Sequence, residues 1–250
     1  MARAAVRGRL SWALGDVVEL IDETRRVRSI VLDVPDWPGH RAGQHVDVRL
    51  TAEDGYQAQR SYSIASAPDD ARLAITVESL PDGEVSSYLV GELRVGDKLE
   101  LRGPIGGYFV WDPDRTEPLF LVAGGSGVVP LMSMIRERHA IGATVPTKLL
   151  FSSRARDDVI YRDELEQLAS AGDGFEVIHT LTRMQPDGWT GYARRVDTQM
   201  LSEVAWPASE MPASFVCGPT PFVEAVASAL VSLGHPAPAI KTERFGPTGG

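Results

Sequence analysis

The residues with the clearest chemical potential form a Gly-Gly-Ser-Gly turn at 124–127, directly after the apolar run 119–123. Such a run is typical of a strand buried on both faces of a parallel sheet. Pro130 suits the first turn of a following helix, because its missing N–H would have no acceptor there. Together these features would gather N–H donors at the positive end of a helix dipole, which suits a phosphate. A tight turn without a ligand gives the same pattern, so both interpretations stay open.

A second chemically capable stretch is Arg60–Ser66. On a strand, Arg60 and Tyr62 share one face, where they could pair with a phosphate and stack on a flat heterocycle. From the residues alone, an exposed edge strand is the preferred interpretation. Further along, Ser86 and Ser87 begin a candidate helix. Either serine could be an N-cap, or this helix start could be a second anion site.

Composition excludes several classes of function. The net charge of −9 argues against nucleic acid as a partner. The single cysteine, Cys217, excludes an internal disulfide and any four-cysteine iron–sulfur or zinc site, and the five histidines lack metal-ligand spacing. No apolar stretch is long enough to span a membrane. We therefore expect a cytoplasmic protein without membrane insertion.

Two kinds of pattern divide the chain. Residues 14–110 contain short β-branched runs between turn formers, which predict an antiparallel barrel or sandwich. After the polar stretch 112–118, apolar strands alternate with helical patterns, which predicts a parallel sheet with helices on both faces. We expect one domain at 1–114 and another at 115–250. The expected strands are 17–21, 27–34, 45–50, 60–64, 73–78, 98–101, 119–123, 147–152, 175–181 and 214–217, and the expected helices are 86–93, 129–140, 161–170 and 221–233.

Four motifs resemble those of the ferredoxin–NADP reductase family. They are Arg60-x-Tyr62-Ser63-x-x-Ser66 for the flavin, Gly83-x-Val85-Ser86-Ser87 for its pyrophosphate, Ala123–Pro130 for the nicotinamide nucleotide, and Val216-Cys217-Gly218-Pro219 beside the nicotinamide. The family usually has Thr where Ser126 stands. The four motifs occur in the family's order and cover both domains. The resemblance implies a six-stranded antiparallel FAD-binding β-barrel, then a Rossmann-like NAD(P)-binding domain, without a fused [2Fe–2S] domain.

The resemblance also implies roles for individual residues. Tyr62 would stack on the isoalloxazine and Ser63 would lie by flavin N5, while Cys217 would help to position the nicotinamide. Phe245 is the nearest candidate for the aromatic residue that covers the flavin, although Gly246–Gly250 follows it. These four residues form the expected catalytic group. The expected cofactor-binding residues are Arg60, Tyr62, Ser63, Val77, Gly83, Val85, Ser86, Ser87, Gly125, Ser126, Gly127, Arg154, Thr182, Arg183, Cys217, Gly218, Pro219 and Phe245.

The choice between NADPH and NADH depends on a charge. A 2′-phosphate needs cations, whereas a bare ribose is commonly held by a carboxylate. Arg154, the pair Thr182-Arg183 and the pair Arg194-Arg195 follow strands and favour NADPH. The acidic pair Asp157-Asp158 is the opposing signal, which keeps NADH possible.

The resemblance therefore implies an FAD-dependent oxidoreductase that transfers hydride between NADPH and flavin. It would pass electrons to a separate acceptor, either a ferredoxin-like iron–sulfur protein or a small molecule. One alternative is an NADH-using reductase component of an oxygenase, or a flavin or quinone reductase. Another, of a different class, is a flavin- and nucleotide-binding subunit without turnover of its own.

Overall fold

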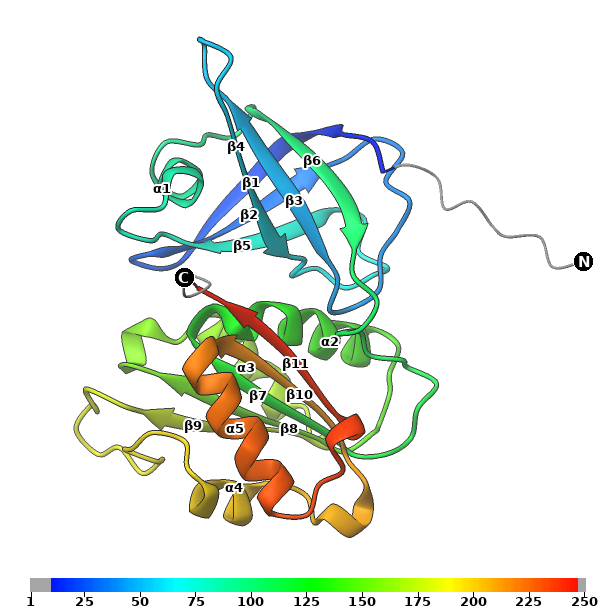
Figure 1. Cartoon of the computed structure of the whole chain (residues 1–250), viewed down its shortest axis with the longest axis vertical. Coiled ribbons are helices and arrows are strands. Elements are labelled where there is room, and N and C mark those ends of the chain that lie inside the picture. The colour runs from blue at the N-terminus through cyan, green and yellow to red at the C-terminus, as the bar shows by residue number, and fades with distance from the viewer. Residues whose placement is uncertain (1–9, 247–250) are drawn as a thin grey trace, which may run out of the picture.

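The computed structural model describes residues 10–246, and within this range the chain forms two sheets stacked along the long axis (Figure 1). The basic N-terminal residues 1–9 and the tail residues 247–250 lie outside the described range. The first sheet is antiparallel, with strand order β4-β3-β6-β1-β2-β5. Its elements are β1 (Ala13–Thr24), β2 (Val27–Asp33), β3 (His45–Thr51), β4 (Gln57–Ser63), β5 (Leu73–Glu78), α1 (Glu84–Gly91) and β6 (Lys98–Ile105).

This first sheet closes on itself as a barrel. A bridge between Ile64, just after β4, and Ile75 within β5 joins the two outermost strands of the sheet. Along β5, Leu73, Ile75 and Val77 point into the apolar core of the barrel, as the alternation of a strand requires. The predicted antiparallel barrel is thus confirmed.

Helix α1 begins two residues earlier than predicted. Gly83, with extended backbone angles, occupies the N-cap position, and no side chain caps the helix. The Ser86 hydroxyl instead donates to the Gly83 carbonyl at 3.1 Å and accepts from the Leu80 N–H at 3.2 Å. Ser86 therefore fixes the loop before the helix and is not its N-cap.

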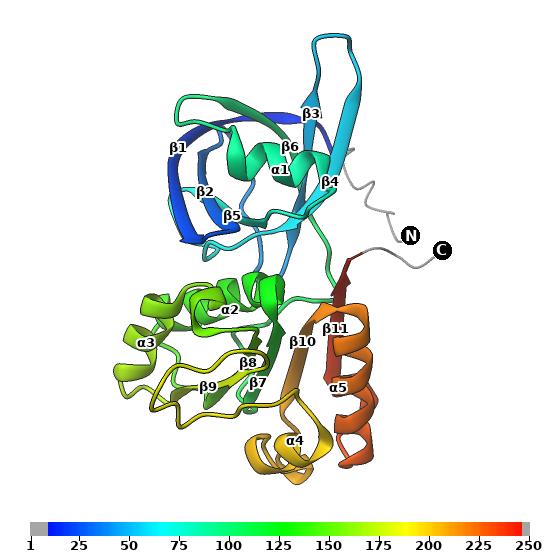
Figure 2. The ribbon, with the colours of Figure 1, turned by 90° about the vertical axis from the view of Figure 1, so that its left-hand side faces the viewer.

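The second sheet is parallel, with strand order β11-β10-β7-β8-β9. Its elements are β7 (Leu119–Gly124), α2 (Val128–Ala140), β8 (Thr147–Ser153), α3 (Arg162–Ser170), β9 (Phe175–Leu181), α4 (Thr198–Val204), β10 (Ala213–Pro219), α5 (Thr220–Ser232) and β11 (Ile240–Phe245). Helices α2 and α3 cover one face and α4 and α5 the other (Figure 2). This confirms the prediction of helices on both faces, although the short helix α4 was not predicted. Strand β11 escaped the sequence analysis because this edge strand is mostly polar.

The connection between the two sheets runs through residues 106–118, and α2 lies directly against the barrel (Figure 1). The division at residues 114 and 115 falls within this connection and stays a prediction. Among residues 10–246, none of the helices combines the length and the apolar character that a bilayer crossing requires.

The glycine turn after β7 permits a close backbone approach at Gly127. A Cβ atom placed there would lie 2.2 Å from the Cys217 carbonyl oxygen and 2.8 Å from the Gly218 nitrogen. The start of α2 therefore touches the end of β10 through bare backbone, which only glycine permits.

We predict that Gly127→Ala destabilises the protein by about 1–3 kcal/mol, because backbone must move to admit the methyl group. Gly107→Ala is the matched control, since a Cβ there meets nothing within 4 Å. Urea unfolding of both variants measures the difference. Equal midpoints for the two would contradict the close approach at Gly127.

Candidate functional site

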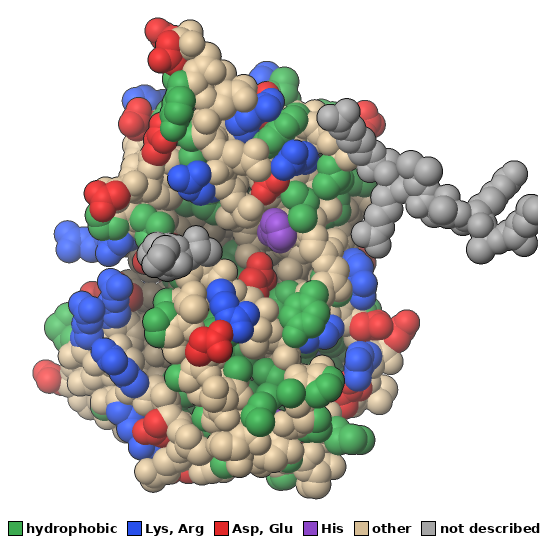
Figure 3. Space-filling view, viewed as in Figure 1, with side chains coloured by type: hydrophobic (Ala, Val, Ile, Leu, Met, Phe, Trp, Pro, Cys, Tyr) green, Lys and Arg blue, Asp and Glu red, His purple; other side chains and the backbone are tan. Residues whose placement is uncertain are grey.

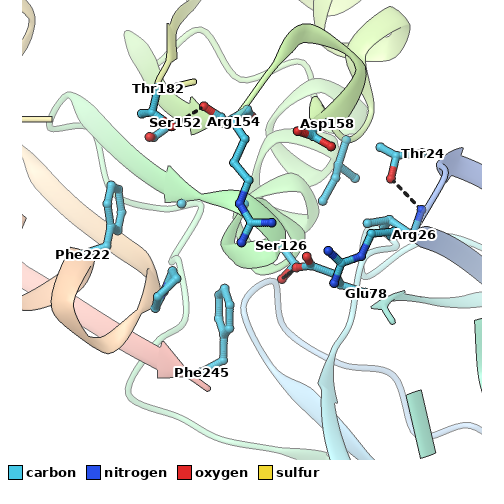
Figure 4. Close-up of a pocket in the computed structure, with 16 residues that line it drawn as sticks. Thr24, Arg26, Glu78, Ser126, Ser152, Arg154, Asp158, Thr182, Phe222 and Phe245 are labelled. Atoms are coloured by element: carbon cyan, nitrogen blue, oxygen red, sulfur yellow. Dashed lines mark hydrogen bonds between the residues drawn. The ribbon is translucent and has the colours of Figure 1, made fainter. Parts of the chain in front are cut away.

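A cavity of about 210 Å³ lies where the parallel strands end against the barrel (Figure 4). Its barrel wall comes from the β1–β2 hairpin and the end of β5, and its other wall from the ends of β7, β8, β10 and β11 and the start of α5. The lining residues are Thr24, Arg26, Val27, Glu78, Gly124, Gly125, Ser126, Ser152, Ser153, Arg154, Asp158, Ile160, Thr182, Pro219, Phe222 and Phe245. Parallel strands and the turns that follow them commonly place ligands at this edge.

The glycine turn presents its backbone to this cavity. Gly125 has a φ of +56° and open space where a side chain would point, so its conformation favours glycine. The Ser126 hydroxyl donates to the Glu78 carboxylate of the barrel at 2.7 Å. The turn leads directly into α2, and the Val128 N–H at the start of this helix donates to the Gly125 and Ser126 carbonyls. The phosphate site that the sequence predicts at this turn stays a prediction.

The ends of β8 and β9 bring the predicted cations close together. The Thr182 N–H donates to the Ser153 carbonyl and the Arg183 N–H to the Arg154 carbonyl, both at 2.9 Å. Arg154 and Thr182 line the cavity, together with Asp158. Arg183 is exposed and lies outside the set of lining residues. Lys and Arg side chains gather along the left side of the second, α/β domain in Figure 3, where these strands end.

Three predicted residues meet at the ends of β10 and β11. Cys217 is buried, and this burial raises the pKa of its thiol well above the usual value, which keeps the thiol protonated. Pro219 and Phe245 are paired across the two strands, and both line the cavity. The Phe222 ring covers Gly124 and Gly218, since a Cβ at either glycine would lie within 3 Å of it. Gly218 is thus a packing position.

Glu243 lies beside Cys217 in the register of β10 and β11, and the sequence analysis missed it. The side-chain oxygen Oε2 is buried without a hydrogen-bond partner among the described residues. Burial raises the pKa of this carboxyl from 4.5 to about 7. Its only sequence signal is a position two residues before Phe245, which alone predicts nothing.

The predicted flavin residues lie on a different part of the barrel. Tyr62 and Ser63 end β4, and Tyr62 is half-buried, so desolvation raises its pKa to about 12. Arg60 is exposed, and among residues 10–246 its guanidinium donates only to the Gln59 carbonyl. The side chains of Val77 and Val85 point into the barrel core, so only their backbone could meet a cofactor.

Unpaired cations and free N–H groups make the two regions suitable for phosphates. Within residues 10–246, Arg26, Arg60, Arg154 and Arg183 form no salt bridge. The first turn of α1, beside Gly83, also offers N–H groups without intrahelical acceptors. The residues present therefore fit one dinucleotide on the barrel and a second at the glycine turn.

A barrel with an anion-accepting helix start, followed by a Rossmann-like sheet with a glycine turn, defines the class of two-domain flavoprotein oxidoreductases. Comparison with known families agrees. The family model "Oxidoreductase FAD-binding domain" matches residues 16–110, and "Oxidoreductase NAD-binding domain" matches residues 121–228. The chain belongs to the ferredoxin–NADP reductase family of FAD-dependent, NAD(P)H-using reductases.

Two relatives and one solved structure indicate the range of similar proteins. The chain is 35% identical over 209 residues to NADH-cytochrome b5 reductase 1 of Emericella nidulans, covering 80% of this chain and 66% of the relative. It is 35% identical over 247 residues to a glycine betaine monooxygenase reductase subunit of Pseudomonas aeruginosa, covering 95% of this chain and 66% of the relative. It thus spans about two thirds of the length of these relatives. A cytochrome P450 reductase from Amycolatopsis superposes with a TM-score of 0.83 at 27% identity, over 98% of this chain and 74% of that one.

We predict that Glu243→Gln reduces the loss of stability that the wild type suffers at alkaline pH. The folded state holds the Glu243 proton more tightly than the unfolded chain does, so stability falls as pH rises from 4.5 through about 7. Glutamine cannot ionise and avoids this loss, by at most roughly 3 kcal/mol. Unfolding curves at about pH 5.5 and about pH 8 measure the difference. A Gln variant that loses as much stability as the wild type would contradict the buried, unpaired state of Glu243.

Proposed function

We propose that this protein takes hydride from a reduced nicotinamide nucleotide at the glycine turn and passes electrons, through flavin on the barrel, to a separate acceptor. The observation that carries this proposal is the shared cavity. Glu78 and Arg26 of the barrel line it together with Ser126, Arg154 and Phe245 of the nucleotide domain. Two domains that contribute to one cavity can bring two cofactors together, and proximity is the main requirement of hydride transfer.

When bound, FAD supplies the hydride acceptor and then releases electrons singly. We assign Arg60, Ser87 and the first-turn N–H groups of α1 to the flavin pyrophosphate, with Gly83 and Ser86 shaping that turn. Tyr62 and Ser63 would face the ring system, and Val77 and Val85 would contribute backbone groups.

On the nucleotide side, we assign Gly125, Ser126 and Gly127 to the pyrophosphate of the visiting nucleotide. Cys217, Gly218 and Pro219 would shape the nicotinamide site, with Phe245 as its aromatic cover. We also place the domain boundary at residues 114 and 115.

The acceptor is proposed to be the partner protein of an oxygenase system. This proposal rests on similarity, because one relative is the reductase subunit of a monooxygenase and a similar structure is a cytochrome P450 reductase. A single cysteine cannot hold a four-cysteine cluster, so within this sequence no iron–sulfur centre of that kind can relay the electrons. A ferredoxin-like iron–sulfur protein is the acceptor we favour, and a cytoplasmic location stays a prediction.

Anaerobic titration of the FAD-loaded protein with NADPH and with NADH tests the proposed function. We expect bleaching of the flavin absorbance by one equivalent of nucleotide, followed by turnover with a ferredoxin-like acceptor. Flavin that binds but is never reduced by either nucleotide would make the chain a non-catalytic binding subunit. Reduction followed by turnover only with free flavin or quinone would replace the protein acceptor by a small one.

NADPH is the nucleotide we favour, and NADH is the second candidate. Arg154 and Thr182 line the cavity, and the backbone bond from Arg183 to Arg154 keeps a second guanidinium near the same strand ends. Two arginines that form no salt bridge within the described part of the chain would suit a 2′-phosphate. Asp158 also lines the cavity and could hold a bare ribose, in line with the NADH in one relative's name.

We predict that Arg183→Ala raises the KM for NADPH about tenfold and changes the KM for NADH less than about twofold, because only NADPH carries the 2′-phosphate. Arg162→Ala is the control, since that arginine sits on α3 and is paired with Asp163. Steady-state kinetics with both nucleotides provide the measurement. Equal effects on both KM values would show that Arg183 does not read the 2′-phosphate.

A further inference from the structure

A polar seam joins the barrel to the nucleotide domain beside the cavity. Its members are Glu23, Ser29 and Thr76 of the barrel and Arg136, Tyr161 and Glu164 of the nucleotide domain. The Tyr161 hydroxyl donates to Thr76 Oγ1 at 2.5 Å, and the Ser29 hydroxyl donates to Glu23 at 2.6 Å. Thr76 and Ser29 are joined at 2.8 Å. Since each hydroxyl holds one hydrogen, Thr76 must donate to Ser29, and the chain of donors runs from Tyr161 to Glu23.

The backbone of Tyr161 is held in an unusual conformation. Its φ of 58° and ψ of 27° lie in the left-handed region, which bulky residues rarely adopt. Such a conformation persists only where the surrounding structure fixes it, and it often marks a functional position. Burial raises the pKa of the Tyr161 hydroxyl, so the hydroxyl stays protonated and remains a donor.

Arg136 holds Tyr161 from the other side. Its guanidinium lies 4.9 Å from the centre of the Tyr161 ring. The same group forms two hydrogen bonds to Glu164, at 2.8 and 2.7 Å, and donates to the Ala65 carbonyl of the barrel at 2.7 Å. The ring of Tyr161 is therefore fixed by its own domain, while its hydroxyl reaches into the other.

Seam residues and cavity residues alternate on the same segments of chain. In each of four segments a seam residue lies one or two positions from a residue that lines the cavity, and two of these cavity residues, Thr24 and Glu78, are labelled in Figure 4. The pairs are Glu23 with Thr24, Ser29 with Val27, Thr76 with Glu78, and Tyr161 with Ile160. A change in the distance between the two domains at the seam would therefore move both walls of the cavity.

We propose that Tyr161 is a positioning residue whose hydrogen bond to Thr76 sets the width of the nucleotide cavity and so seats the visiting nucleotide against the barrel. This inference rests on the proposed function, since it concerns the same cavity. Tyr161 touches neither cofactor in this assignment. It acts through Thr76 and the end of β5, which carries Glu78 and its bond to Ser126.

Tyr161→Phe tests the inference in the FAD-loaded protein. Phenylalanine keeps the ring against Arg136 and leaves no buried hydrogen unpaired, because Thr76 still donates to Ser29, so we expect the variant to fold. We expect weaker binding of ADP-ribose, which lacks nicotinamide, by about fivefold, and slower flavin reduction by NAD(P)H by about tenfold. Calorimetry measures the first and anaerobic stopped flow the second. FAD content and reduction by dithionite, which needs no nucleotide cavity, should be unchanged.

Tyr108→Phe is the matched control. Its hydroxyl donates to the Ile240 carbonyl at 3.4 Å, at the beginning of β11, whereas Phe245 at the end of that strand lines the cavity. We expect this variant to stay within about twofold of the wild type in both measurements. The double variant Tyr161→Phe with Thr76→Val removes both partners of the hydrogen bond. Because both substitutions abolish the same bond, the double variant should lose no more ADP-ribose affinity than one lost bond accounts for, and not twice that amount.

Three results would overturn the inference. One is a Tyr161→Phe variant that binds ADP-ribose and is reduced as fast as the wild type. Another is an effect no larger than that of Tyr108→Phe. The third is a matching loss of FAD or of dithionite reduction, which would assign Tyr161 to folding of the barrel. If NAD(P)H cannot reduce the flavin of the wild-type protein, the proposed function is refuted instead. The effect of Tyr161→Phe on ADP-ribose affinity would still test whether Tyr161 sets the width of the cavity.

Discussion

The hydrogen bond between Ser126 and Glu78 lies where the barrel covers the edge of the parallel sheet at which its strands end. The site depends on the covering of this edge. Parallel strands all end at one edge of their sheet, and the turns that follow leave N–H groups without acceptors. That edge cannot be covered by the sheet's own helices, which pack on its faces. In this protein the barrel covers it, so the surface that a phosphate would seek becomes a cavity shared by two domains.

The two domains contribute different groups to this cavity: backbone from the nucleotide domain and side chains from the barrel. The nucleotide domain contributes bare backbone at Gly125 and Gly127, where a side chain would either point into open space or strike the neighbouring strand. The barrel contributes side chains from strand ends, such as Arg26 and Glu78. Because a strand alternates its faces, β5 can fill the barrel core with Val77 and still present Thr76 and Glu78 to the other domain.

Burial raises the pKa values of two groups near the ends of β10 and β11. The Cys217 thiol stays protonated, and the Glu243 carboxyl has a pKa raised to about 7. No described side chain offers Glu243 Oε2 a hydrogen bond, so its proton is held by desolvation alone. The cations instead lie at the ends of β8 and β9, on the far side of the glycine turn. Arg154 and the barrel's Arg26 line the cavity together with the carboxylates Glu78 and Asp158.

The sequence by itself determined the two sheets and their order along the chain, because strand periodicity and glycine turns are local patterns. Its four motifs indicated the family by resemblance. It also singled out Ser126, Arg154 and Thr182 beside such patterns, and Phe245 by resemblance to the family, and all four line the cavity. Only the tertiary structure decided which side chains from other segments meet them. Glu78, Tyr161 and Glu243 carry no local signal, since their environments arise from residues distant in the chain. The polar edge strand β11 was missed for the same reason: its pairing with β10, not its composition, makes it a strand.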